Sequence, residues 1–501
     1  MQPAVLHSPG DDGQAAGGNP LRITDGTWTW AQREPARVAI RCDGRIVTYG
    51  GLAAWSNSIA ADLRSAGGCD GRPVAVDVTG GPAFLAAFLG VVKAGAIAAP
   101  IPPGWTAAQR KAALDLLQPA AVVTGRPGDP ATSVERVAGR EAPHAAASLA
   151  WESDRPFYIG FSSGSTGTPK AIVRNHRAWL NSFLAMSLEF EVGMAHNVVI
   201  PGDPAWSFSL IAALHALFCG YTVVLPGSAG TREALDLACQ WGGVVYAVPS
   251  VLAEMTRRAG RLGSVCDAVS HIICAGEKLH AQTRAAAQTA FPAARIFEYY
   301  GASELGFVAV LGDEDAATHP GSVGRPFLGS RVAVLDEKGR ELPPGQAGLL
   351  CAQTEYGCIG YWDAGIVDAA LDHHGWQTVG DLAVRDESGM VTLAGRRDNM
   401  VVIKGQNIYP EAVESVIGAV PGVSDAVVTG EPVEAPMHLV ALVVPSRDAD
   451  ELASRGIVDH CRAHLDGPAV PRRVVLTSEL PRTPAGKVDR AEAARQARRI
   501  T

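Results

Sequence analysis

The sequence predicts an α/β fold, with a large amino-terminal domain of doubly wound α/β subdomains plus a β subdomain, and a small α+β carboxyl-terminal domain. Short β-branched or aromatic runs alternate with amphipathic stretches over residues 47–300, a pattern typical of parallel strands joined by crossover helices. Helical patterns then become rare, and a separate cycle of helices and strands starts after residue 398. The length of 501 residues also exceeds the roughly 250 to 300 residues at which a single core stops growing.

In the doubly wound region, β-branched and aromatic runs predict strands at 73–78, 157–161, 221–225, 243–248, 271–274 and 296–300. Apolar residues recur at helical spacing at 52–65, 84–92, 178–188, 210–218 and 282–289. Such sheets bind ligands beyond the carboxyl ends of their strands, so the residues that follow these runs are candidates for a site.

The β subdomain is predicted from runs separated by Gly and Pro turns, at 332–335, 348–353 and 390–393. The last hundred residues predict helices at 411–419 and 451–465, and strands at 426–429, 439–444 and 473–477. We expect the boundary between the two domains at 395–398.

The composition is that of a folded protein without affinity for nucleic acid. Hydrophobic residues make up 47% of the chain and charged residues 19%, far from the composition of disordered chains. With 43 Lys and Arg against 51 Asp and Glu, the formal net charge is −8, so the chain lacks the basic surplus that neutralises nucleic-acid phosphates.

Several sequence features predict a cytoplasmic location. The longest apolar stretch, residues 82–92, is much shorter than the ~20 residues that span a bilayer, so no membrane span is expected. Nine cysteines without CxxC spacing suggest neither a disulfide framework nor a zinc site. Residues 1–22 are rich in glycine, without the apolar core of a secretory peptide, and are predicted to be a disordered leader.

A Ser/Thr/Gly-rich loop follows the predicted strand at 157–161. Its small and hydroxyl residues allow close approach of an anion and donate hydrogen bonds to it, and a lysine adds positive charge. The loop differs from the common nucleotide-binding loop because Thr168 and Pro169 separate the last glycine from the lysine. A phosphate cradle and a flexible connector both fit this segment alone. Its candidate nucleotide-binding residues are Ser162, Ser163, Gly164, Ser165, Thr166, Gly167 and Lys170.

Four further segments occur in a characteristic order. They are Tyr300-Gly301-Ala302-Ser303-Glu304, Gly380-Asp381-Leu382, Gly395-Arg396-Arg397-Asp398 with Gly405-Gln406-Asn407-Ile408-Tyr409-Pro410, and Pro484-Ala485-Gly486-Lys487. With the Ser/Thr/Gly loop, this series resembles the superfamily of adenylate-forming enzymes, which holds acyl- and aryl-coenzyme A ligases, adenylation domains of nonribosomal peptide synthetases and firefly luciferases. The resemblance extends from about residue 28 to 490 and is closest to an acyl- or aryl-coenzyme A ligase. It implies an adenylate-forming domain at 23–394, a hinge at 395–398 and a mobile domain at 399–501.

The resemblance implies a role in nucleotide binding for each motif. The Ser/Thr/Gly loop would hold the β- and γ-phosphates of ATP, and the ring of Tyr300 would stack on adenine. The hydroxyl of Ser303 would contact the α-phosphate. Glu304 would bind Mg²⁺, a hard cation that prefers oxygen ligands. Asp381 would accept hydrogen bonds from the ribose hydroxyls, and Arg396 would contact the ribose or a phosphate.

Catalysis and thiol transfer are assigned to the carboxyl-terminal domain by the same resemblance. Lys487 would meet the negative charge that builds up during adenylation. Rotation about Asp398 would then withdraw it and open a coenzyme A tunnel at Lys404, Gly405 and Gly276. Lys404 takes the place of the first of two family glycines, so it would narrow the tunnel or contact a phosphate.

The acyl pocket is predicted to contain Trp206, Ser207, Phe208, Tyr299, Gly301 and Phe307. Amino-acid-activating relatives carry an Asp where this chain has Ser207, and a buried ammonium would lack a partner here. The aromatic residues favour a bulky apolar or aromatic acid, although packing in the core explains them equally well.

These residues predict an ATP- and Mg²⁺-dependent acid–thiol ligase that makes an acyl adenylate and transfers the acyl group to coenzyme A. The partners are therefore a small carboxylic acid and either coenzyme A or a carrier protein. The alternatives are an enzyme that runs one half-reaction, and a catalytically silent nucleotide- or acyl-binding protein. The basic tail at 490–499 is predicted to be solvated, with a contact to coenzyme A phosphates as the alternative.

Overall fold

The computed structural model describes residues 21–67, 69–125, 132–136, 152–162, 170–193, 196–227, 230–363, 366–368, 372–373, 376–403, 406–433, 435–446, 454–483 and 488–499. The predicted leader therefore lies almost entirely outside the described residues.

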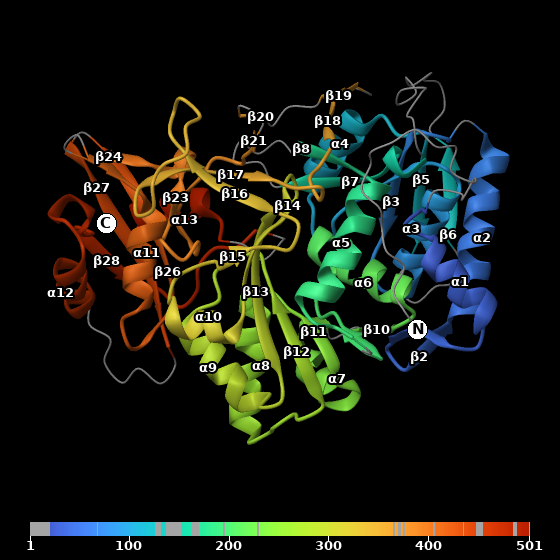
Figure 1. Ribbon diagram of the computed structural model, residues 1–501, viewed down its shortest axis with the longest axis horizontal. Helices are drawn as coiled ribbons and strands as arrows, with labels where there is room; N and C mark the ends of the chain where they lie inside the picture. The colour runs from blue at the N-terminus through green and yellow to red at the C-terminus, as the bar shows by residue number, and fades with distance from the viewer. Residues whose placement is uncertain are drawn as a thin grey trace.

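Two large sheets form the doubly wound region (Figure 1). One has the order β15 (Arg325–Pro326), β14 (Gly306–Leu311), β13 (Arg295–Ala302), β12 (Val269–Cys274), β11 (Gly243–Tyr246), β9 (Asn197–Val199), β10 (Thr222–Leu225), β1 (Val38–Cys42) and β2 (Arg45–Thr48). The other has the order β19 (Ile366–Asp368), β18 (Gly360–Asp363), β8 (Lys170–Asn175), β7 (Pro156–Ser162), β4 (Ile97–Pro100), β3 (Pro73–Val78), β5 (Ala121–Gly125) and β6 (Thr132–Arg136).

The predicted parallel pairing is confirmed in the middle of both sheets. Strands β1, β10, β9, β11, β12 and β13 pair in parallel, as do β5, β3, β4 and β7. Towards the edges, β1 with β2, β5 with β6, β7 with β8 and β13 with β14 pair antiparallel, because hairpins connect them in place of crossover helices.

Helices cover the sheets in layers. A shared core packs α2 (Tyr49–Ala66), α3 (Gly81–Lys93), α5 (His176–Glu189) and α6 (Ser207–Cys219) against strands of both sheets. The outer face of the first sheet packs against α7 (Ala234–Trp241), α8 (Pro249–Leu262) and α9 (Ala281–Ala290), and that of the second against α4 (Ala107–Leu117). Strand alternation decides which side chains reach which core: Val74 and Val76 belong to the shared core, while Ala75 packs with α4. Helix α1 (Asp25–Arg33) packs against α2 and α6 at the side of the shared core, and α10 (Asp313–Thr318) lies beside β13.

The predicted β subdomain is a sheet of β16 (Arg331–Leu335), β17 (Ala347–Gln353), β20 (Asp372–His373), β21 (Trp376–Gln377), β22 (Asp381–Arg385) and β23 (Val391–Arg396). The carboxyl-terminal domain combines a hairpin of β24 (Val401–Ile403) and β25 (Gln406–Ile408) with a sheet of β26 (Val423–Val433), β27 (Ala435–Pro445) and β28 (Arg473–Leu476). One core contains α11 (Pro410–Gly418) and α12 (Ser454–His464), and a second contains α13 (Arg490–Arg499).

Two expectations from the sequence are wrong. Cys239 and Cys266 are joined as a disulfide, with their Cα atoms 5.1 Å apart, because the fold brings α7 and the segment after α8 together. Arg490 is not part of a solvated tail: its two terminal nitrogens each donate to a carboxylate oxygen of Glu414 at 2.7 Å. This ion pair fixes the start of α13 against α11.

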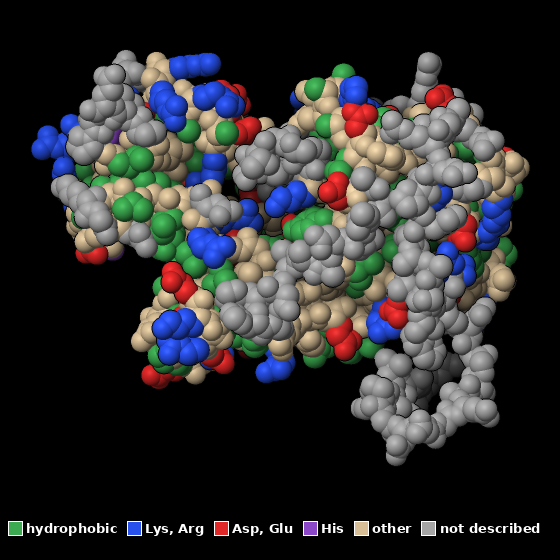
Figure 2. All heavy atoms as spheres, turned by 90° about the horizontal axis from the view of Figure 1, so that it is seen from above, with side chains coloured by type: hydrophobic (Ala, Val, Ile, Leu, Met, Phe, Trp, Pro, Cys, Tyr) green, Lys and Arg blue, Asp and Glu red, His purple; other side chains and the backbone are tan. Residues whose placement is uncertain are grey.

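The surface carries charges of both signs. Basic and acidic side chains are interspersed over the face shown in Figure 2. Among the described residues, no helix combines the length and apolar character needed to span a bilayer.

Acid sensitivity is expected from the buried His215 in α6. Its Nε2 lies 2.9 Å from the hydroxyl of Ser187, and burial lowers its pKa to about 4 from the ordinary 6.5. Between these values the unfolded chain binds a proton that the folded chain does not, so this stability is present above pH 6.5 and is lost as the pH falls. The expected slope is about 1.4 kcal/mol per pH unit.

Urea unfolding of the wild type and His215→Phe at pH 7, 6 and 5 measures this contribution. We expect a shallower loss of stability on acidification in the variant. The control, His464→Phe, changes an exposed histidine of α12 and should keep the wild-type slope. Equal slopes for wild type and His215→Phe would contradict the assignment.

Candidate active site

A buried carboxylate joins two of the predicted nucleotide motifs. Asp381 begins β22, and Arg396 ends β23 as its partner in the antiparallel register. The Nε of Arg396 donates to Asp381 Oδ1 at 2.8 Å, and the hydroxyl of Tyr300, near the carboxyl end of β13, donates to Oδ2. Burial and the charge of Asp381 raise the pKa of Tyr300, so its hydroxyl stays protonated as a donor. A carboxylate has about four acceptor positions, so this one is held rigidly and still has capacity for ribose hydroxyls.

Ser303 and Glu304 lie in the turn between β13 and β14. The backbone carbonyl of Glu304 accepts from the amide of Cys358 at 2.7 Å, and its Oε1 lies 3.5 Å from the hydroxyl of Tyr361. The Nζ of Lys170, the first residue of β8, lies 5.8 Å from the centre of the Tyr361 ring. Tyr361 therefore lies between the lysine and the carboxylate predicted to bind phosphate and Mg²⁺. The carboxylate oxygens of Glu304 are ligands of the kind that a hard divalent cation prefers.

Arg174 is a buried cation beneath this turn that the sequence reasoning missed. Its Nη1 donates to the backbone carbonyl of Ser303 at 2.7 Å, and its Nη2 donates to that of Tyr356. The residue is only 5% exposed, and its Nε has no hydrogen-bond partner among the described residues. Burial lowers its pKa to about 10, so it remains charged at neutral pH. A charged residue inside the apolar strand 171–174 was the available signal.

The predicted acyl-pocket residues lie next to the turn. Ser207 begins α6, directly after Trp206, and its Oγ lies 3.3 Å from Ser303 Oγ. The ring of Phe208 lies 6.1 Å from that of Tyr299. The acyl segment and the nucleotide segment therefore meet at the two serine hydroxyls.

Phe307 and Gly301 of this group serve the packing of the hairpin β13–β14. Phe307 is 2% exposed and its ring lies 4.6 Å from Tyr299 and 4.7 Å from Phe327, so it is a core residue. A Cβ on Gly301 would lie 2.1 Å from the carbonyl oxygen of Gly306. Only glycine is therefore accommodated at this position without a shift of the backbone.

The predicted tunnel residue Gly276 lies beside a contact between the two domains. It follows β12 with a φ of +99°, which favours glycine. The next residue, Glu277, pairs at 3.2 Å with Arg482 of the carboxyl-terminal domain, and Arg482 also pairs with Asp425. Several predicted site residues lie outside the described residues: 163–167 of the Ser/Thr/Gly loop, Lys404, Gly405, Lys487, and the side chains of Ser162 and Asp398.

Comparisons with known proteins match almost the whole chain. The family model of the AMP-binding enzymes matches residues 27–362, and that of their C-terminal domain matches residues 412–487. The uncharacterized acyl–CoA ligase YhfT of Bacillus subtilis (strain 168) is 31% identical over 482 residues, which cover 94% of this chain and 97% of that protein. The fatty acid–[acyl-carrier-protein] ligase ScoC of Streptomyces coeruleorubidus is 28% identical over 493 residues, covering 92% and 94%. The solved structure of the amide bond synthetase McbA from Marinactinospora thermotolerans has a TM-score of 0.81 at 23% identity, covering 95% and 99%.

Proposed function

The chain belongs to the AMP-binding enzyme family, and on that basis we propose that it is an ATP- and Mg²⁺-dependent acid–thiol ligase. It would activate a bulky apolar or aromatic carboxylic acid as an acyl adenylate and transfer the acyl group to coenzyme A. The observation that carries this proposal is the contact between Ser207 and Ser303, because it joins the acyl segment to the nucleotide segment. The two reactants of adenylation are the carboxylate of the acid and the α-phosphate of ATP, and both would lie beside these two serines.

The chemistry has two steps. A carboxylate oxygen of the acid attacks the α-phosphorus of ATP, and the bond from that phosphorus to the bridging oxygen breaks, so pyrophosphate leaves. The thiol sulfur then attacks the acyl carbonyl, AMP leaves and the thiol proton passes to solvent. When bound, Mg²⁺ supplies positive charge at the phosphates, and Glu304 would hold it.

The residues around the junction supply binding and charge. Asp381, held by Tyr300 and Arg396, would orient the ribose, while Lys170 would bind phosphate oxygens. We assign the hinge to Asp398 and the adenylation lysine to Lys487. Residues 23–394 and 399–501 would then be the two domains that change orientation between the steps.

The side chain of Ser207 limits the class of acid. A neutral hydroxyl cannot form an ion pair with a substrate ammonium, and burying an ammonium without an opposite charge costs free energy. The aromatic residues Trp206, Phe208 and Tyr299 offer apolar surface instead. We therefore expect acids without an α-amino group.

A carrier protein is the second candidate for the acceptor. The similarity to ScoC over 92% of the chain favours it, since that relative is a ligase for an acyl carrier protein. The two acceptors present the same phosphopantetheine thiol, so the chemistry at the acyl adenylate would be unchanged.

Mass spectrometry of the purified protein with ATP, Mg²⁺ and a panel of aliphatic, aromatic and polycyclic acids tests the proposal. Each acid is incubated alone, with coenzyme A, and with a phosphopantetheinylated carrier protein. We expect AMP and an acyl-coenzyme A for a bulky acid. Thioester on the carrier alone would establish the second candidate. ATP binding without AMP or adenylate, across all acids, would overturn the proposal and favour a silent binding protein.

A further inference from the structure

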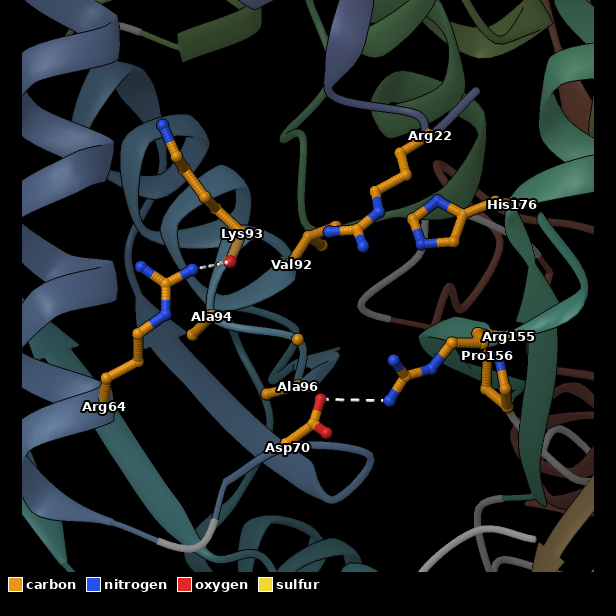
Figure 3. Close-up of a pocket in the computed structure, with 11 residues that line it drawn as sticks. Arg22, Arg64, Asp70, Val92, Lys93, Ala94, Ala96, Arg155, Pro156 and His176 are labelled. Atoms are coloured by element: carbon orange, nitrogen blue, oxygen red, sulfur yellow. Dashed lines mark hydrogen bonds and ion pairs between the residues drawn. The ribbon is translucent and has the colours of Figure 1, made fainter. Parts of the chain in front are cut away.

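A polar cavity of about 170 Å³ lies at one end of the β7–β8 hairpin, beside Pro156, while Ser162 and Lys170 pair at the other end. We call it the basic cavity, because Arg22, Arg64, Lys93, Arg155 and His176 contribute to its lining with a single carboxylate, Asp70. Figure 3 shows Arg22 and Arg155 entering from the side of His176, and Arg64 from the side of α2. A water molecule needs only about 10 to 15 Å³ of such space, so the cavity has room for a larger ligand.

The cations of the basic cavity differ in their partners. Asp70 pairs with Arg155 at 3.0 Å. The Nη2 of Arg64 donates to the backbone carbonyl of Lys93, and the ammonium of Lys93 contacts the side-chain oxygen of Asn57 and lies 3.9 Å from the ring centre of Trp28. Among the described residues, neither Arg64 nor Lys93 has a carboxylate partner.

The pKa values of two titratable groups in the basic cavity are lowered, first by burial and then by neighbouring positive charges. Burial, and then the charge of Arg64, lowers the pKa of Lys93. Burial, and then the charges of Arg22 and Arg155, lowers the pKa of His176 to about 3. His176 is therefore neutral at physiological pH, and its Nδ1 accepts from the amide of Ile23 at 3.1 Å, so its proton is on Nε2. The wall of the cavity thus offers a neutral N–H donor beside the guanidinium groups.

The basic cavity is separate from the nucleotide site. In the register of the hairpin, Pro156 pairs with Asn175 at the cavity end, and Ser162 pairs with Lys170 at the loop end. Six residue steps of extended strand span roughly 20 Å. A ligand in the cavity would therefore be too far from the Ser162–Lys170 end of the hairpin to contact Lys170.

We propose that the basic cavity binds the phosphate group of a small anionic molecule other than the ATP being consumed. Guanidinium groups recognise phosphate oxygens through paired hydrogen bonds, and a dianion offsets the repulsion among the cations. Carboxylate ligands carry less charge and fewer acceptor oxygens, so phosphate is the better match. This inference goes beyond the ligase function and does not depend on it.

Isothermal titration of the full chain with inorganic phosphate, at constant ionic strength set with chloride, tests the proposal. We expect saturable binding to the wild type, and an increase of about ten-fold or more in the dissociation constant of Arg64→Glu, in line with the loss of a charge-assisted hydrogen bond. Arg257→Glu is the matched control, because it reverses the charge of an arginine on α8 whose ion pair, within the described part of the chain, is with the exposed Glu254.

Lys170→Ala distinguishes the basic cavity from the Ser/Thr/Gly loop. Phosphate affinity that survives in this variant and falls in Arg64→Glu supports the proposal. No binding, or binding lost in Lys170→Ala and kept in Arg64→Glu, overturns it. Arg155→Gln provides a second variant from the opposite wall if circular dichroism shows that Arg64→Glu is unfolded.

Discussion

Replacing Lys487 with alanine is expected to slow formation of the acyl adenylate at least ~100-fold, while transfer of the acyl group from a supplied adenylate to a thiol continues. The effect is large because adenylation concentrates negative charge on the α-phosphate and the bridging oxygen. A preorganised ammonium stabilises that charge in a site from which water is excluded. Thiol attack on the anhydride creates no comparable charge at the triphosphate.

Lys487 itself lies outside the described residues, but residues on both sides of it are described. Arg482 and Val488 form an antiparallel bridge. Arg482 also pairs with Glu277 of the large domain at 3.2 Å, so the two domains are in contact at Arg482.

The two steps are measured separately, by ATP–pyrophosphate exchange with the accepted acid and by thioester formation from the chemically prepared adenylate. Lys111→Ala is the control, because Lys111 lies on the exposed face of α4 and pairs at 2.5 Å with Asp115, a contact of little energetic weight. Equal loss of both steps in Lys487→Ala would contradict the assignment.

Replacing Arg174 with glutamine is expected to reduce kcat/KM for adenylation by about 100-fold, although Arg174 is a positioning residue. The variant removes the donors that hold the carbonyls of Ser303 and Tyr356, and a shift of about 1 Å in reacting groups can cost that factor. It also removes a buried positive charge near Glu304.

The expected result is a fall in kcat with a smaller rise in KM for ATP. Arg174→Lys should restore part of the activity, because lysine keeps the positive charge but cannot reproduce both hydrogen bonds to the two carbonyls. Arg177→Gln is the matched control, because Arg177 is exposed, is the second residue of α5 and, among the described residues, forms its ion pair with Asp154. Leaving the two carbonyls without donors costs about 1 to 3 kcal/mol each, so urea unfolding must show that the variant remains folded. A folded Arg174→Gln with wild-type adenylation would refute this role.

The alternation of strands and helices could be predicted from the sequence, because the spacing of apolar residues differs between the two and depends only on nearby positions. The predicted strand at 73–78 is observed as β3 with the same bounds, and the predicted helix at 84–92 is α3 with a few residues added. Antiparallel strands such as β8 and β14 were not distinguished, since an apolar run looks the same whether a hairpin or a crossover precedes it. The family was also readable, because its motifs are short and ordered along the chain.

Two interactions of the candidate site could not be predicted. Arg174 and Ser303 are 129 positions apart, and Tyr361 and Glu304 are 57 apart, so no local pattern records their contacts. From the sequence, Phe307 could equally pack in the core or contact the substrate. The structure places it in the aromatic core beside Phe327.

The sequence by itself determined the α/β class, the large core and the order of the nucleotide motifs, since each depends on residues close together in the chain. Only the tertiary structure decided that Asp381 is held by both Tyr300 and Arg396, that the buried Arg174 donates to the carbonyl of Ser303, and that Cys239 pairs with Cys266. The physical reason is that packing of layers brings together segments whose separation in sequence carries no periodic signal. Burial also changes the energetic weight of a charge. Desolvation makes the hydrogen bonds of one buried arginine important for stability, and composition does not show which arginine is buried.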